Sequence, residues 1–66
     1  MNSPRFAIEV MDVITKEIAY TYYFDITNDK KIIEKIDELR RSTYVTINRF
    51  YYANNYGIEI EFDKEV

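Results

Sequence analysis

The chain has 66 residues, with nine Lys and Arg, twelve Asp and Glu, and a formal net charge of −3 at pH 7. It contains no cysteine and no histidine, which excludes disulfides, zinc sites and haem or iron–sulfur ligation, and we expect no cofactor. We expect one domain over residues 1–66, with residues 1–4 as a frayed tail. A chain this short buries only about 60% of its unfolded surface, so its seven tyrosines and four phenylalanines must supply much of the packing.

Two segments in the first half of the chain are predicted to form a β-hairpin. Apolar residues occupy even positions in "RFAIEVMDVI" and in "IAYTYYFDI", the period of a half-buried strand. A three-residue loop, 15–17, would pair Val10 with Tyr22. The same register pairs Ile8 with Phe24, so that large apolar residues oppose one another. We therefore predict this register.

The segment "TNDKKIIEKIDELRRST" changes to helical spacing. Thr27 or Asn28 can cap its start, and Arg40 and Arg41 in the last turn complement the helix dipole. A helix of about 14 residues is about 21 Å long and can cover one face of a small sheet. Its predicted apolar stripe consists of Ile32, Ile33, Ile36 and Leu39.

A second hairpin follows the helix. "TYVTINRFYYA" and "GIEIEFDKE" have the composition and alternation of strands, and "NNYG" fits a four-residue loop in which Gly57 takes a left-handed conformation. A four-residue loop would bury Val45, Ile47 and Tyr51. A five-residue loop would expose these three residues and bury Phe50 and Tyr52. A bulge near residue 48 could combine the two arrangements. The sequence leaves this register open.

These elements predict an α+β fold of the order β-β-α-β-β, a four-stranded antiparallel sheet with one helix packed on one face. The other face is then uncovered, and in either register it combines carboxylates with rings and apolar side chains such as Ala7. Tyrosine-bearing patches of this kind often mark partner sites. The candidate partner-binding residues are Glu9, Met11, Tyr23, Asp25, Phe50, Tyr52, Tyr56, Glu59, Glu61 and Asp63.

Chemistry at these carboxylates is disfavoured. Cβ atoms two residues apart on a strand lie about 7 Å from each other, which is wide for chelating a hard cation, and we expect no metal site. An open sheet face offers no cleft for catalysis, and without histidine or cysteine the remaining nucleophiles and bases are few. We expect the protein not to be an enzyme. Arg49 is expected to pair with a carboxylate, Glu61 if it lies on the uncovered face.

The leading hypothesis is a non-enzymatic protein-binding module, an inhibitor or adaptor that presents the acidic, tyrosine-rich face to a basic surface of another protein. The runner-up is a single-stranded nucleic-acid-binding protein that stacks bases on sheet tyrosines. Nucleic acid is disfavoured because carboxylates share that face and the net charge is negative. A homodimer formed by this protein is the third hypothesis.

Location and origin are inferred from composition. No apolar run approaches the ~18 residues of a membrane span, and "MNSPRF" lacks the apolar segment of a secretory signal. We therefore expect a cytoplasmic protein, of a bacterium or of a virus-infected host cell, with no membrane partner. Isoleucine, lysine, asparagine and tyrosine are frequent, as in AT-rich bacterial or viral genomes. Unrelated small proteins share this layout, including phage-encoded inhibitors, so a phage-type inhibitor is one version of the hypothesis.

Overall fold

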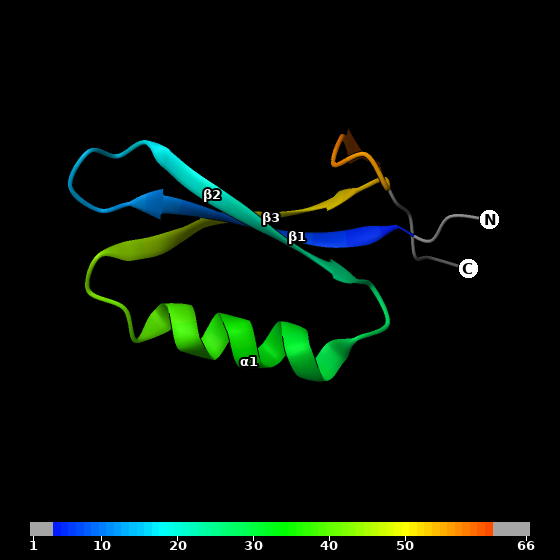
Figure 1. The fold of residues 1–66 in the computed structure, drawn as a ribbon, viewed down its shortest axis with the longest axis horizontal. Helices are drawn as coiled ribbons and strands as arrows, with labels where there is room; N and C mark the ends of the chain where they lie inside the picture. The colour runs from blue at the N-terminus through cyan, green and yellow to red at the C-terminus, as the bar shows by residue number, and fades with distance from the viewer. Residues whose placement is uncertain (1–3, 62–66) are drawn as a thin grey trace.

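The computed structural model describes residues 4–61, which form four strands and one helix (Figure 1). The elements are, in chain order, β1 (Arg5–Asp12), β2 (Ile18–Asp25), α1 (Asp29–Arg40), β3 (Val45–Ala53) and β4 (Glu59–Ile60). The strands pair antiparallel in the order β2-β1-β3-β4, and α1 lies across one face of the sheet. This confirms the predicted α+β fold. No helix in the described part of the chain is long and apolar enough to cross a membrane.

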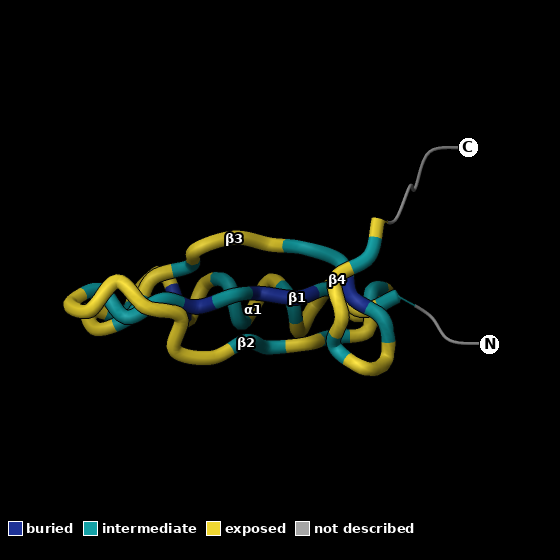
Figure 2. Tube along the Cα trace, turned by 90° about the horizontal axis from the view of Figure 1, so that it is seen from above, coloured by how far each residue is buried: buried dark blue, intermediate teal, exposed yellow. Residues whose placement is uncertain are grey.

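β1 is the central strand of the core. Its apolar residues pair on both sides, with β2 and with β3, and most of the fully buried positions lie on it (Figure 2). Ile8 and Val10 from β1 and Leu39 from α1 form the buried cluster. The partly buried side chains packed against this cluster are Phe6, Tyr22, Phe24, Ile36, Val45 and Ile47.

The first hairpin keeps the predicted faces, but the predicted register is wrong by two residues. Ile8 pairs with Tyr22 and Phe6 with Phe24, so the connection runs over 13–17 instead of 15–17. The Asp12 carboxylate fixes this longer turn, because it accepts hydrogen bonds from the backbone N–H groups of residues 14 and 15 at 2.8 and 3.1 Å. A shift of two residues returns each side chain to the same face, which explains why the apolar pattern alone could not exclude it.

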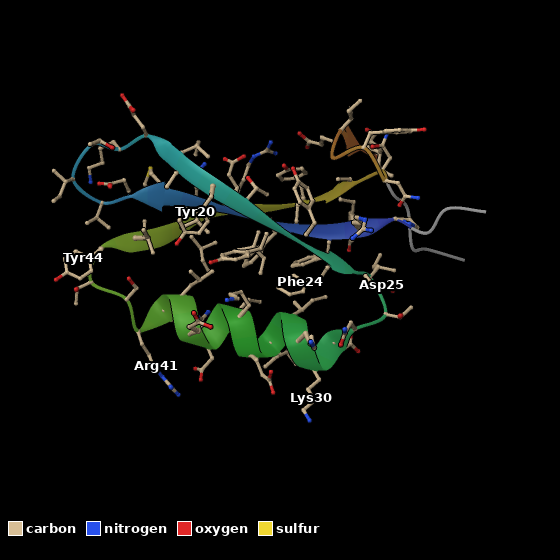
Figure 3. All side chains as sticks on the ribbon, viewed as in Figure 1. Tyr20, Phe24, Asp25, Lys30, Arg41 and Tyr44 are labelled. Carbon is tan, nitrogen blue, oxygen red and sulfur yellow. The ribbon has the colours of Figure 1, made fainter. Side chains whose placement is uncertain are left out.

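The helix begins where the sequence predicts. Asn28 is the N-cap and accepts a hydrogen bond from the Lys31 N–H, which satisfies one of the unpaired donors of the first turn. Lys30 and Arg41 point away from the sheet (Figure 3). Ile33 is 64% exposed, so its assignment to the buried stripe is wrong. At 100° per residue it lies well to one side of the direction set by Ile36 and Leu39.

The second hairpin combines two of the predicted alternatives. Tyr52 pairs with Ile60 and Ala53 with Glu59, which is the register of a five-residue loop. The pairing with β1 shifts between Glu9 and Val10, leaving Asn48 as a bulge residue on β3. Because of the bulge, residues 45 and 47 on one side of it and residues 50 and 52 on the other all face the helix.

Aromatic contacts fill the space between the sheet and the helix. Phe6 stacks on Phe50 with ring centroids 5.4 Å apart and meets Tyr52 edge-on at 6.0 Å. On β2, Tyr20 meets Tyr22 edge-on at 5.2 Å, and the Lys35 ammonium lies over the Tyr22 ring at 4.4 Å. Figure 3 shows Tyr20 and Phe24 on the side of β2 that faces the helix. These rings replace the larger aliphatic core that a longer chain would have.

Three predictions fall at the ends of the chain. The fourth strand was predicted over 57–65, and the structure assigns Glu59–Ile60 to it; residues 62–65, with the candidate Asp63, lie outside the described residues. Apart from Pro4, the predicted frayed tail 1–4 also lies outside them.

Candidate functional site

The sheet surface opposite α1 is called the open face here. Register places on it the odd-numbered residues of β1 and β2 and the residues that pair with them. Its paired members are Arg5, Ala7, Glu9, Met11, Ile18, Thr21, Tyr23, Asp25, Thr46, Arg49, Tyr51, Ala53 and Glu59. Five of the candidate residues therefore share this surface, namely Glu9, Met11, Tyr23, Asp25 and Glu59.

Two tyrosines form a bridge over the middle of the open face. Ala7 pairs with Tyr23 on one side and with Tyr51 on the other, and the two hydroxyl oxygens lie 3.3 Å apart. Ala7 is fully buried beneath them, so the expectation that it would be exposed is wrong. The small side chain leaves room for the two tyrosine hydroxyls to meet above it.

The loop between β3 and β4 extends this bridge. The Tyr23 hydroxyl donates to the Gly57 carbonyl oxygen at 3.4 Å. Gly57 has φ = 82°, as predicted, and a Cβ atom placed there would lie 3.3 Å from the Tyr23 hydroxyl oxygen. Asn54 fixes the loop, because its side-chain oxygen accepts from the N–H groups of Tyr56 and Ile58. The loop geometry therefore depends on a glycine at position 57.

Arg49 is the centre of an ion-pair network on the same face. Its guanidinium donates to both carboxylate oxygens of Glu59, at 2.9 and 3.1 Å, and its Nε lies 3.4 Å from Glu9. It also lies over the Tyr51 ring, 4.4 Å from the centroid. Arg49 was expected to pair with Glu61, whereas the observed register brings Glu59 and Glu9 to it. The bulge residue Asn48 donates to the second oxygen of Glu9 at 2.7 Å.

These contacts change the protonation behaviour of the face. The hydrogen bonds from Arg49 lower the pKa of Glu59, and the Tyr23 hydroxyl, followed by partial burial, raises the pKa of Tyr51. Glu59 is therefore ionised and Tyr51 protonated throughout the physiological range.

Asp25 has a structural role at the end of β2 (Figure 3). Its carboxylate accepts from the Thr27 hydroxyl at 2.6 Å and from the Thr27 N–H at 2.9 Å. Both bonds lower the pKa of Asp25. They form the turn that leads into α1, and they leave the negative charge at the margin of the open face, opposite Arg5.

The structure places the other described candidates, Phe50, Tyr52, Tyr56 and Glu61, at different sites. Phe50 and Tyr52 face the helix, because the bulge inverts their side relative to the four-residue-loop alternative. Tyr56 is 85% exposed at the loop tip and lines a shallow hollow together with Arg5, Tyr23, Asn55 and Gly57. Glu61 is exposed just beyond β4. The structure thus brings Tyr56 to the open face and removes two rings from it.

Tyr51 was expected on the uncovered face only in the five-residue-loop register, and Gly57 was predicted as a loop residue and not as part of the site. With a bulge at residue 48, the alternation along β3 puts Tyr51 on the same face as Arg49 and Ala53, and this pattern could have identified it.

Within residues 4–61, no group of three or more carboxylates is arranged to hold a metal ion. A comparison with family models, curated proteins and solved structures gave no match to this chain.

Proposed function

We propose that this chain is a small non-enzymatic protein-binding module, an inhibitor or adaptor, whose open face docks on a basic surface of a partner protein. The observation that carries the proposal is the combination of locked tyrosines with an excess of carboxylates on one surface. The cations there are Arg5 and Arg49. The carboxylates are Glu9, Asp25 and Glu59, with Glu61 just beyond β4, so four negative charges exceed two positive ones by two.

Preorganisation supports this assignment. Tyrosine rings supply a large contact area with few rotatable bonds, and hydroxyls that are already held lose little freedom when a partner binds. Tyr23 is held by the Tyr51 hydroxyl and the Gly57 carbonyl, and Tyr51 is held further by Arg49. A surface of this kind suits specific recognition because its geometry exists before the complex forms.

The charge of the face favours a basic partner. Arg49 neutralises part of the charge of Glu9 and Glu59, and Arg5 lies opposite Asp25, so the least compensated carboxylate among the described residues of this surface is Glu61. Carboxylates at a margin accelerate association and set orientation more than they add affinity. One concrete version is an inhibitor of the phage type that occupies a nucleic-acid-binding groove, with carboxylates in place of phosphates.

The geometry weighs against base stacking as the main activity. A base needs the free face of a ring, and the Arg49 guanidinium already lies over the Tyr51 ring. The carboxylates of Glu9 and Glu59 beside it would repel a phosphate backbone. Fluorescence anisotropy with labelled single-stranded oligonucleotides at low salt tests this alternative, and tight binding there would replace the protein-docking proposal.

Charge reversal at the margin tests the docking proposal. The chain is immobilised, used to capture a protein from a lysate of the native host, and the captured protein is then purified and titrated. Glu61→Lys is the test variant, because Glu61 is exposed and lies outside the Arg49 network. Glu34→Lys on the exposed side of α1 is the control with the same change of charge.

We expect Glu61→Lys to weaken binding about tenfold at low salt and Glu34→Lys to change it by less than about twofold. The wild-type affinity should fall as salt is raised. Equal effects of the two variants, or failure to retain any protein at low salt, would contradict the proposal.

A further inference from the structure

β2 is an exposed edge of the sheet. It pairs only with β1 among the described residues, and Figure 2 shows it along one margin of the sheet, with the loop between β3 and β4 reaching its C-terminal end. In an antiparallel pair, every second residue of an edge strand directs its N–H and C=O groups away from the neighbouring strand. Over residues 18–24, β2 therefore presents outward-directed backbone groups that pair with no other described strand, whereas the Asp25 carbonyl accepts from the Asn28 N–H.

The edge lacks the features that normally protect such strands. Natural edges carry charges or proline, or they are very short. The stretch "IAYTYYF" (18–24) contains no charged residue, no proline and no glycine. Three of its large side chains remain substantially exposed, Ile18 at 49%, Tyr20 at 42% and Tyr23 at 38%. One irregularity, next to Ala19, lies near its start, and the rest of the strand is regular.

The opposite end of the sheet is different. β4 covers the outer edge of β3 at Tyr52 and Ala53, and the chain continues beyond β4 outside the described residues. Arg40 and Arg49 line a hollow beside residues 46–50 of β3, so this side of the sheet carries positive charge. The edge whose residues 18–24 carry no charge is therefore β2, and its one irregularity lies near its start.

We propose that β2 pairs antiparallel with β2 of a second copy of this chain, which joins two four-stranded sheets into one. An antiparallel pair of identical strands is self-complementary about a two-fold axis perpendicular to the sheet. That axis leaves both helices on the same side of the joined sheet. The β2 side chains on the helix side of one copy therefore lie beside the corresponding β2 side chains of the other copy. With the axis at Tyr22, Tyr22 opposes its counterpart and Tyr20 opposes Phe24 of the other copy.

The small core explains why a second copy is the occupant. Within residues 4–61, the fully or nearly fully buried residues are Ala7, Ile8, Val10, Leu39 and Ala53, two of them alanines. Domains of this size without disulfides or a metal are commonly stabilised by association. Pairing through β2 would continue the aromatic row of Tyr20, Tyr22 and Phe24 across the axis. The inference does not depend on the proposed function, although the dimer would set two open faces side by side.

Thr21→Lys is the variant that tests the edge. Thr21 pairs with Glu9 within the chain, so a lysine there gains an opposite charge in the monomer. In the proposed dimer the two lysines would lie close to the two-fold axis and repel each other. Thr43→Lys makes the same change of charge at an exposed position between α1 and β3 and serves as the control. Circular dichroism checks that each variant is folded.

The mass is measured by analytical ultracentrifugation from low micromolar to about 1 mM protein. We expect the wild type and Thr43→Lys to approach twice the monomer mass with rising concentration, and the dissociation constant of Thr21→Lys to be at least about tenfold higher. Backbone hydrogen exchange followed by NMR provides a second measurement that needs no variant. On dimerisation, alternate amides of β2 should become protected.

A chain that is monomeric over the whole range, or one in which Thr21→Lys associates as tightly as the wild type, would overturn the proposal. Association without new protection in β2 would also overturn it, because the contact would then be made by the open face or the helix. If the chain stayed monomeric and an extended peptide bound along β2 instead, the partner of this edge would be that peptide and not a second copy, which would also overturn the proposal.

Discussion

Gly57→Ala is expected to destabilise the protein strongly for one small added methyl group. Residue 57 has φ = 82°, and a left-handed conformation costs a residue with a β-carbon about 1–2 kcal/mol. The new Cβ would lie 3.3 Å from the Tyr23 hydroxyl oxygen, so this ring must move. Its hydrogen bonds with Gly57 and Tyr51 would weaken, at a net cost of about 1 kcal/mol.

The two costs add to about 2–3 kcal/mol, which is a large part of the free energy of unfolding of a small domain. At about 0.05–0.15 kcal/mol per residue, a chain of 66 residues has a stability of about 3–10 kcal/mol. The corresponding decrease in Tm is about 10–20 °C. Urea unfolding followed by tyrosine fluorescence gives the free energy, and thermal unfolding followed by circular dichroism gives Tm.

Two control chains separate the two causes. Replacing Gly57 by D-alanine keeps the positive φ and directs the methyl group away from Tyr23, so we expect a stability within about 0.5 kcal/mol of the wild type. In a Tyr23→Phe background the hydroxyl contact is absent, and Gly57→Ala should then cost only the backbone component, about 1–2 kcal/mol. A Gly57→Ala chain as stable as the wild type would refute the reasoning, because the loop would then not hold this conformation against Tyr23.

Three further outcomes are expected. Arg49→Gln removes the ion pairs with Glu9 and Glu59 and should lower Tm more at about 0.02 M salt than at about 0.5 M. Arg49→Lys should recover little of this stability, because an ammonium group cannot replace the two parallel hydrogen bonds to Glu59. A decrease in Tm that does not depend on salt would contradict the ion-pair network. The pKa of Asp25 is lowered in the folded state, so its contribution to stability is present above about pH 4 and is lost as pH falls through the folded pKa. Asp25→Asn should flatten the acid limb of a Tm–pH curve, and an unchanged limb would contradict the Thr27 contacts. The pKa of Tyr51 is raised, so its contribution is present below about pH 10 and is lost as pH rises through the folded pKa. Tyr51→Phe should reduce the alkaline loss of stability and remove one late-titrating tyrosinate from the ultraviolet absorbance titration. A variant that loses an early-titrating tyrosinate and keeps the whole late component would rule out the contact with Tyr23.

Strand and helix assignments followed from the sequence because β1, most of β2 and α1 each keep one period. Ile8 and Val10 face the core and Glu9 faces the open side, as the alternation in β1 predicts. The cap at Asn28 and the positive φ of Gly57 are also confirmed. These features are local, since each depends on residues within a few positions of one another along the chain.

Registers were harder to predict because they depend on single side chains in the turns. The Asp12 carboxylate holds the first turn two residues earlier than the apolar pattern indicated. On β3 the bulge at Asn48 places residues of both parities on the helix side, which moved Phe50 and Tyr52 away from the predicted site. The same bulge brought Arg49 to Glu59 in place of Glu61. A strand with apolar residues on both parities is the signal that a bulge is present.

Site-specific photo-crosslinking tests the role of the open face most directly. A photoreactive phenylalanine analogue is placed at position 56, beside the hollow with Arg5 and Tyr23, or at position 33 on the helix, where the native isoleucine is 64% exposed. In a lysate of the native host we expect the analogue at position 56 to crosslink to a partner protein, at a basic surface of that partner. We expect no crosslink to the same protein from position 33. The same protein crosslinked equally well from position 33 would contradict docking through the open face.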